Sequence, residues 1–97
     1  KKIRSMLIEF TVKVKNPLGL HTRPATNIVR ALQRTKSKVT FTYKRQTVNA
    51  KSILSILLLA ANRNATLTVS VDGEDAEDVK ELLKQVIENP YEDVCTL

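Results

Sequence analysis

Residues 16–25 hold the only histidine of the chain, His21, in a pattern typical of a turn that leads into a helix. Gly19 favours the turn, and Pro24 suits the first helical turn, where no N–H is needed from it. A helix N-terminus carries unpaired backbone N–H groups and about half a positive charge, so it can hold phosphoryl oxygens. Arg23 would add a guanidinium beside them. The segment therefore indicates a histidine that could carry phosphate.

An ordinary structural explanation exists for each of these two side chains. A lone histidine in a turn is more often a surface residue than a site, and Arg23 could be a solvated cation. A positive charge at the positive end of a helix is locally unfavourable, however, which favours an anion next to Arg23. A neutral imidazole nitrogen is also the nucleophile that phosphoryl transfer to a histidine needs.

Ser52 begins a second candidate segment, because it precedes an apolar helix predicted over 53–61. Ser52 is a preferred N-cap residue worth about 1 kcal/mol. The apolar stripe is unusually wide: one face holds Ile53, Ile56, Leu57 and Ala60, and Leu54 and Leu58 extend it. Part of this helix must be core, and the rest is available to a partner.

The composition favours one small domain with protein partners. The chain has 97 residues, and residues 1–71 carry a net charge of +13 against −7 for residues 72–97. Such a basic body suits nucleic acid or an acidic protein. Only 4% of residues are aromatic, and no zinc or helix-turn-helix motif occurs, so we expect an acidic protein partner and no nucleic acid. Salt-dependent nucleic-acid binding remains the weaker alternative.

Several other classes of protein are disfavoured. The longest apolar stretch is too short to span a bilayer, and Glu9 interrupts any export signal, so we expect no membrane association and a cytoplasmic location. A single cysteine, Cys95, fits a reducing compartment. One histidine and one cysteine do not form a metal site, and no glycine-rich nucleotide loop occurs, so no cofactor is expected.

The hydrophobic pattern predicts seven elements in the order β-α-β-β-α-β-α. Strands are expected over 8–14, 38–43, 46–49 and 66–71, and helices from residue 22, over 53–61, and from residue 74 to a stop at Asn89-Pro90. Lys44-Arg45 lacks Asn or Gly, so a looser hairpin loop is expected there. Alternating strands need one covered face, which favours an α+β open-faced sandwich: a four-stranded antiparallel sheet with three helices on one face.

Three segments resemble the HPr family, the histidine-containing phosphocarriers of the bacterial phosphoenolpyruvate-dependent phosphotransferase system. The segments are Gly19-Leu20-His21-Thr22-Arg23-Pro24-Ala25, Thr47-Val48-Asn49-Ala50-Lys51-Ser52-Ile53-Leu54 and Val71-Asp72-Gly73-Glu74-Asp75. The likeness keeps one register from about residue 10 to residue 87. It implies the same open-faced sandwich, a single domain over 1–97 with its core at about 7–89, and a monomer.

The resemblance also implies a mechanism. Enzyme I would pass a phosphoryl group to Nδ1 of His21, Arg23 would neutralise the phosphate, and a sugar-specific IIA protein would receive it. The protein would be a carrier and not an enzyme. Ser52 matches a serine that HPr kinase/phosphorylase modifies in many members. The expected docking residues for partners are Leu20, Thr22, Ile53, Leu54 and Leu57.

Some positions depart from the family pattern. Leu18 stands where many members have a small polar residue near the phosphate, so that hydrogen bond is expected to be missing. Lys44-Arg45 replaces a frequent Asn-Gly, and Asn64 stands where a glycine usually ends the second helix. A second functional hypothesis therefore stays open: a regulatory HPr-like binding module controlled by phosphorylation of Ser52, with little or no role in sugar transport.

Overall fold

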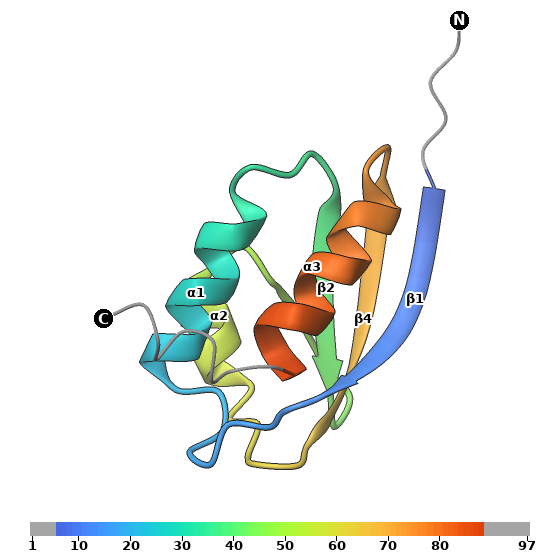
Figure 1. Cartoon of the computed structure of the whole chain (residues 1–97). Coiled ribbons are helices and arrows are strands. Elements are labelled where there is room, and N and C mark those ends of the chain that lie inside the picture. Colours follow the sequence, from blue (N-terminus) through green and yellow to red (C-terminus); the bar gives the residue numbers. More distant parts are fainter. Residues whose placement is uncertain (1–5, 89–97) are drawn as a thin grey trace, which may run out of the picture.

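The computed structural model describes residues 6–88, which form four strands and three helices in the predicted order. The elements are β1 (Met6–Lys13), α1 (Thr22–Leu32), β2 (Lys38–Tyr43), β3 (Gln46–Asn49), α2 (Ile53–Leu58), β4 (Thr66–Gly73) and α3 (Ala76–Glu88). The strands pair antiparallel in the order β1-β4-β2-β3, and the three helices lie on one side of the sheet (Figure 1). The predicted α+β open-faced sandwich is confirmed.

The core lies between the sheet and the helices, as alternation along the strands predicts. Every second residue of β4 is buried from Leu67 to Gly73, and the intervening side chains face away from the helices. The helices contribute their apolar stripes at helical spacing. The largest fully buried side chains are Phe41, Ile28, Leu32, Ile56, Leu67, Leu83, Val12, Val14, Val39, Val69, Val71 and Val79. No helix within residues 6–88 is long and apolar enough to cross a membrane.

Side-chain hydrogen bonds fix both ends of α3. At its start, Asp75 accepts the Ser37 hydroxyl and the Lys36 backbone N–H, the latter at 2.8 Å. The Ser37 hydroxyl above all, with the Lys36 N–H, lowers the pKa of Asp75 because both bonds favour the carboxylate. At its end, Glu88 accepts the backbone N–H of Lys13 at 3.0 Å. The predicted stop at Asn89-Pro90, and Cys95, lie outside the described residues.

The hairpin between β2 and β3 differs from the expected loose loop. Tyr43 pairs with Gln46, so the turn contains only Lys44 and Arg45. Both have positive φ, 50° and 68°, which is the backbone conformation of a tight type I′ turn. The expectation of a looser loop was therefore wrong: the register of β2 against β3 imposes the tight turn on two residues that disfavour it.

Helix α2 is shorter than the predicted 53–61. It ends at Leu58, and Ala60 has a φ of 52°, outside the helical region. Ala60 therefore lies outside the helix, and its predicted place on one helical face with Ile56 was wrong. Leu59 instead turns into the core, with 3% of its surface exposed. The chain leaves the helix early because the next residues bond to a distant loop.

Candidate phosphoryl-carrier site

The loop before α1 is held by a small set of local hydrogen bonds. Gly19 N–H donates to the carbonyl oxygen of Asn16 at 2.9 Å, and His21 N–H donates to that of Gly19 at 3.1 Å. The side chain of Asn16 also takes part, because its Oδ1 accepts the Leu18 N–H at 3.0 Å. This side-chain-closed turn is typical of asparagine. The path of the backbone into His21 is therefore defined residue by residue.

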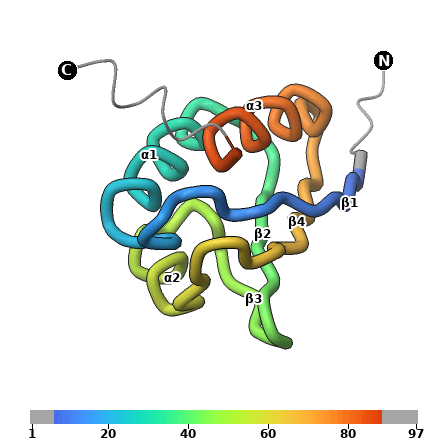
Figure 2. The backbone as a smooth tube through the Cα atoms, turned by 60° about the horizontal axis from the view of Figure 1, so that its bottom comes forward, coloured from blue at the N-terminus to red at the C-terminus, as the bar shows by residue number. Residues whose placement is uncertain are grey.

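This loop is also hydrogen-bonded to the segment that follows α2, and Figure 2 shows these two segments of the backbone side by side. Leu20 N–H donates to the carbonyl oxygen of Ala61 at 2.9 Å. Gly19 has a φ of +74°, and a Cβ there would lie 2.4 Å from the Ala61 oxygen and 2.9 Å from Asn62 Cα. Only glycine fits this position, because both the backbone angle and the space exclude a side chain.

His21 is the N-cap residue of α1. Its backbone is extended, with φ −99° and ψ −166°, and its carbonyl oxygen accepts the Ala25 N–H at 3.1 Å. Its imidazole makes no capping hydrogen bond and is half-buried, so the ring remains available for chemistry. The N–H groups of Thr22 and Arg23 lie in the first helical turn, where no intrahelical carbonyl reaches them. They are the donors that the sequence predicted beside the histidine.

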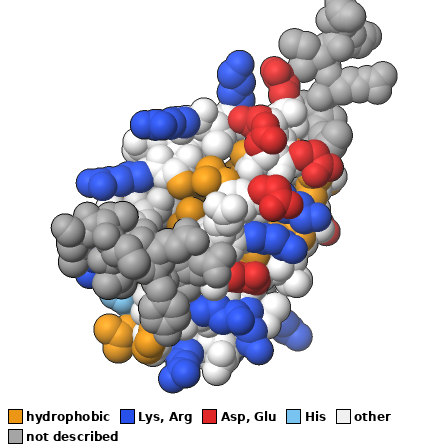
Figure 3. All heavy atoms as spheres, viewed as in Figure 1, with side chains coloured by type: hydrophobic (Ala, Val, Ile, Leu, Met, Phe, Trp, Pro, Cys, Tyr) orange, Lys and Arg blue, Asp and Glu red, His pale blue; other side chains and the backbone are white. Residues whose placement is uncertain are grey.

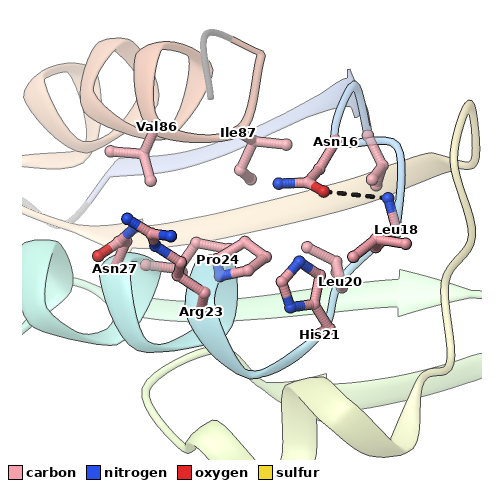
Figure 4. Close-up of a pocket in the computed structure, with 11 residues that line it drawn as sticks. Asn16, Leu18, Leu20, His21, Arg23, Pro24, Asn27, Val86 and Ile87 are labelled. Carbon is pink, nitrogen blue, oxygen red and sulfur yellow. Dashed lines mark hydrogen bonds between the residues drawn. The ribbon is translucent and has the colours of Figure 1, made fainter. Parts of the chain in front are cut away.

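Arg23 is exposed in the first turn of α1, and no acidic residue shares that turn. His21 and Arg23 line one pocket of about 220 Å³ between the 16–20 loop, α1 and the end of α3. In Figure 4 the guanidinium lies on the far side of Pro24 from the imidazole ring. The structure thus brings both predicted groups to the lining of one pocket, where an anion would meet the positive end of α1 and the charge of Arg23.

The pocket contains polar groups that were not singled out as site residues. Asn16 and Asn27 line it with the apolar side chains of Leu20, Val86 and Ile87. Asn27 could have been found from the sequence, since it lies one helical turn after Arg23. Asn16 could not, because its place depends on the fold of the loop.

Ser52 is the N-cap residue of α2. Its Oγ accepts the Ser55 N–H at 3.3 Å, and its side chain is half-buried. The predicted capping role is therefore confirmed. Like α1, this helix has no acidic residue in its first turn.

The five predicted docking residues differ in how much surface they offer. Leu54 is 68% exposed and Ile53 37% exposed, and Thr22 is exposed as well. Leu57 is half-buried against the core, and Leu20 is only 6% exposed, so it offers a partner little surface. Two further apolar side chains are exposed in this region: Leu58 at 62%, and Leu18 at 76% in the loop beside the pocket.

The unequal distribution of charge in the sequence is also visible on the surface. Acidic side chains gather over α3 and the turn before it, whereas lysines and arginines surround them on the rest of this face (Figure 3).

Within residues 6–88, no three His, Cys, Asp or Glu side chains come close enough to hold a metal ion. The fold and the histidine at a helix N-terminus have the form of a small phosphoryl carrier.

Comparisons with known proteins agree with this class. Residues 8–89 match the family model for the "PTS HPr component phosphorylation site". A phosphocarrier protein HPr of Xylella fastidiosa is 35% identical over 85 residues, which cover 88% of this chain and 96% of the relative. One from Chlamydia muridarum is 40% identical over 78 residues, 80% of this chain and 75% of that protein. The crystal structure of HPr from Bacillus anthracis superposes with a TM-score of 0.79 at 32% identity, covering 84% of this chain and 96% of that one.

The chain belongs to the HPr family and is a phosphocarrier of the phosphotransferase system, a carrier rather than an enzyme. The resemblance found in the sequence is thereby confirmed. The family implies partners of the same system, such as Enzyme I and IIA proteins.

Proposed function

We propose that His21 is the residue that carries the phosphoryl group. The Nδ1 lone pair of a neutral imidazole attacks the phosphorus of phosphorylated Enzyme I, an N–P bond to His21 forms, and the bond to the donor breaks. An IIA protein then takes the group by the same displacement. The carrier mainly has to position the phosphoryl group and balance its negative charge, because the transfer passes through a loose transition state.

The observation that carries this proposal is the position of His21 at the N-cap of α1 with its imidazole free of any capping bond. The helix N–H groups and Arg23 can bind phosphoryl oxygens around that ring. The chain has no other histidine, so the assignment has no competitor of the same chemistry.

The test is phosphorus NMR after incubation with phosphoenolpyruvate, magnesium and a bacterial Enzyme I. We expect an acid-labile phosphoramidate signal that is absent in His21→Ala. Arg23→Gln should keep the signal but slow its appearance, while Arg34→Gln, an exposed arginine beyond the end of α1, should leave the rate unchanged. A phosphoramidate in His21→Ala would refute the assignment.

We further propose that the exposed apolar side chains of α2 form the docking surface for acidic partners, with Ile53, Leu54 and Leu58 at its centre. The fold provides a matched control, because Leu54 and Leu7 are exposed to nearly the same extent, 68% and 64%, and Leu7 lies on β1. Leu54→Glu should weaken binding to Enzyme I by roughly tenfold or more, the effect of removing an interface anchor. Leu7→Glu should not, and equal effects would show that only net charge matters.

A regulatory role for Ser52, through HPr kinase/phosphorylase, is the second candidate. Its support is that Ser52 adjoins Ile53 and Leu54, so a phosphate there would put roughly two negative charges beside the apolar surface. Ser52→Asp should then weaken Enzyme I binding more than Ser55→Asp, one helical turn further on. Equal binding by both variants would count against this role.

The remaining proposals concern the whole chain. We propose a single domain with its core at about 7–89, a monomer, and a cytoplasmic location. The match of the family model over residues 8–89 supports the domain boundaries. Sedimentation of the full chain at micromolar concentration tests the monomer.

A further inference from the structure

We infer that Asn16 is a phosphate-binding residue of this carrier: its side-chain amide donates a hydrogen bond to the phosphoryl group on the histidine. The inference rests on the proposed role of His21. It assigns a function to the side chain of Asn16, which closes the turn before His21 by accepting the Leu18 N–H.

The orientation of the Asn16 amide is fixed by its neighbour. The Leu18 backbone N–H is a donor, so the amide atom that it meets at 3.0 Å must be the oxygen. The amide nitrogen is therefore on the opposite side. In Figure 4 it points away from Leu18 and into the pocket that His21 lines.

The backbone of Asn16 strengthens this placement. Its carbonyl oxygen accepts the Gly19 N–H at 2.9 Å, so the residue is held by two hydrogen bonds within the same turn. Holding the amide in one orientation before the phosphate arrives lowers the cost of binding it. The pocket of about 220 Å³ leaves room for a phosphoryl group. Donors then surround the phosphoryl group, with the helix N-terminus and Arg23 on one side and Asn16 on the other.

A purely structural explanation is that Asn16 only closes the turn. Asn16→Asp tests the donor role while keeping the turn, because a carboxylate keeps the acceptor for Leu18 N–H but replaces the amide donor with a negatively charged oxygen. Asn64→Asp is the matched control: it adds the same charge at an exposed position near the loop but outside the pocket.

The experiment measures the rate at which phosphorylated Enzyme I forms phosphohistidine on the wild type, Asn16→Asp and Asn64→Asp. Urea unfolding tests whether each variant keeps its fold. We expect unchanged urea midpoints and a roughly ten- to hundredfold slower transfer for Asn16→Asp alone, the scale of a lost hydrogen bond to a charged group. The pH titration of the phosphorus shift should also move upward in Asn16→Asp, because a nearby carboxylate disfavours the dianion. A wild-type transfer rate in Asn16→Asp would contradict the inference. A slower rate could also come from repulsion by the new carboxylate, so a donated hydrogen bond is identified by the amide resonances of Asn16 in the wild-type protein.

A second measurement does not depend on any variant. In the wild-type protein, the side-chain amide resonances of Asn16 should shift on phosphorylation more than those of Asn64. If the wild-type protein is phosphorylated but the Asn16 amide resonances do not shift, the inference is overturned and the role of His21 stays intact. The same holds if Asn16→Asp accepts phosphate at the wild-type rate. Absence of phosphohistidine in the wild type would refute the proposed function, and this inference with it.

Discussion

Replacement of Gly19 by alanine should destabilise the fold and impair the site together. The φ of +74° costs a residue with a Cβ about 1–2 kcal/mol. The added methyl would lie 2.4 Å from the backbone oxygen of Ala61, and displacing a packed neighbour costs about 1–3 kcal/mol. Alanine also restricts the unfolded chain, which returns about 0.4–1 kcal/mol. The net loss is therefore about 2–4 kcal/mol, a large part of the roughly 5–15 kcal/mol available to a domain of this size.

Urea unfolding followed by far-UV circular dichroism measures this loss, and thermal unfolding should show a midpoint about 10–25 °C lower. Asn64→Ala is the control, because Asn64 also has a positive φ, 70°, but is exposed. It should lose about 1 kcal/mol or less, because asparagine already has a Cβ and alanine is only less tolerant of this backbone angle. Equal losses for the two variants would refute the argument that the contact between the 16–20 loop and Ala61 is rigid.

The same substitution should slow phosphoryl transfer. His21 N–H donates to the Gly19 carbonyl oxygen, so a shift at Gly19 also moves the histidine. A small displacement of a reacting group is costly, because the transfer depends on in-line positioning. If Gly19→Ala accepted phosphate at the wild-type rate, the loop would not be what positions the ring.

Three further predictions concern stability. Lys44→Asn with Arg45→Gly should raise the free energy of unfolding by about 1 kcal/mol, because both positions have positive φ; no gain in urea would show that the turn is unstrained. Asp75→Asn should lose about 1 kcal/mol at neutral pH, since the carboxylate accepts the Ser37 hydroxyl and its pKa is lowered. That contribution is fully present above the unfolded pKa, about 3.9, and is lost as pH falls through the folded pKa, so the two unfolding curves should converge in acid. Ser52→Ala should lose about 0.5–1 kcal/mol and Ser52→Asp almost nothing, because only the first removes the cap; equal losses in urea would contradict the capping role.

The strands and α1 could be predicted because their local patterns agree with their tertiary contacts. Alternation over 8–14 puts Val12 and Val14 on one face and Thr11 on the other, and the structure buries the two valines and exposes Thr11. In α1, the 3.6-residue period puts Ala25, Ile28, Val29 and Leu32 on one stripe, and the structure buries all four.

The end of α2 could not be predicted, because long-range contacts decide it. Residues 59–61 are all apolar and contain no helix breaker, so local propensity extends the helix. The structure instead uses the Ala61 carbonyl oxygen as acceptor for Leu20 N–H, and Ala65 and Asn64 bond to Val14. These bonds between distant segments outweigh the few tenths of a kcal/mol that one more helical residue provides.

The candidate site was predictable only in part, for a similar reason. His21, Arg23 and Ser52 follow from residue type and position in a motif, since caps and first turns are local features. The burial of Leu20 depends on residues about 40 positions away, and the orientation of the Asn16 amide depends on a single backbone N–H. Neither leaves a periodic signal in the sequence.

Two helix N-termini in this fold differ in their charges, and the difference bears on function. The first turn of α3 holds Glu77 and Asp78, which stabilise the positive end of that helix by about 0.3–1 kcal/mol each. The first turn of α1 has no acid and carries Arg23, so the same interaction is unfavourable there in the empty protein. Selection for stability alone would remove that arginine or add an acid. A doubly charged phosphoryl group on His21 would supply the missing negative charge. The unfavourable interaction between Arg23 and the positive end of α1 would then be offset only in the phosphorylated protein.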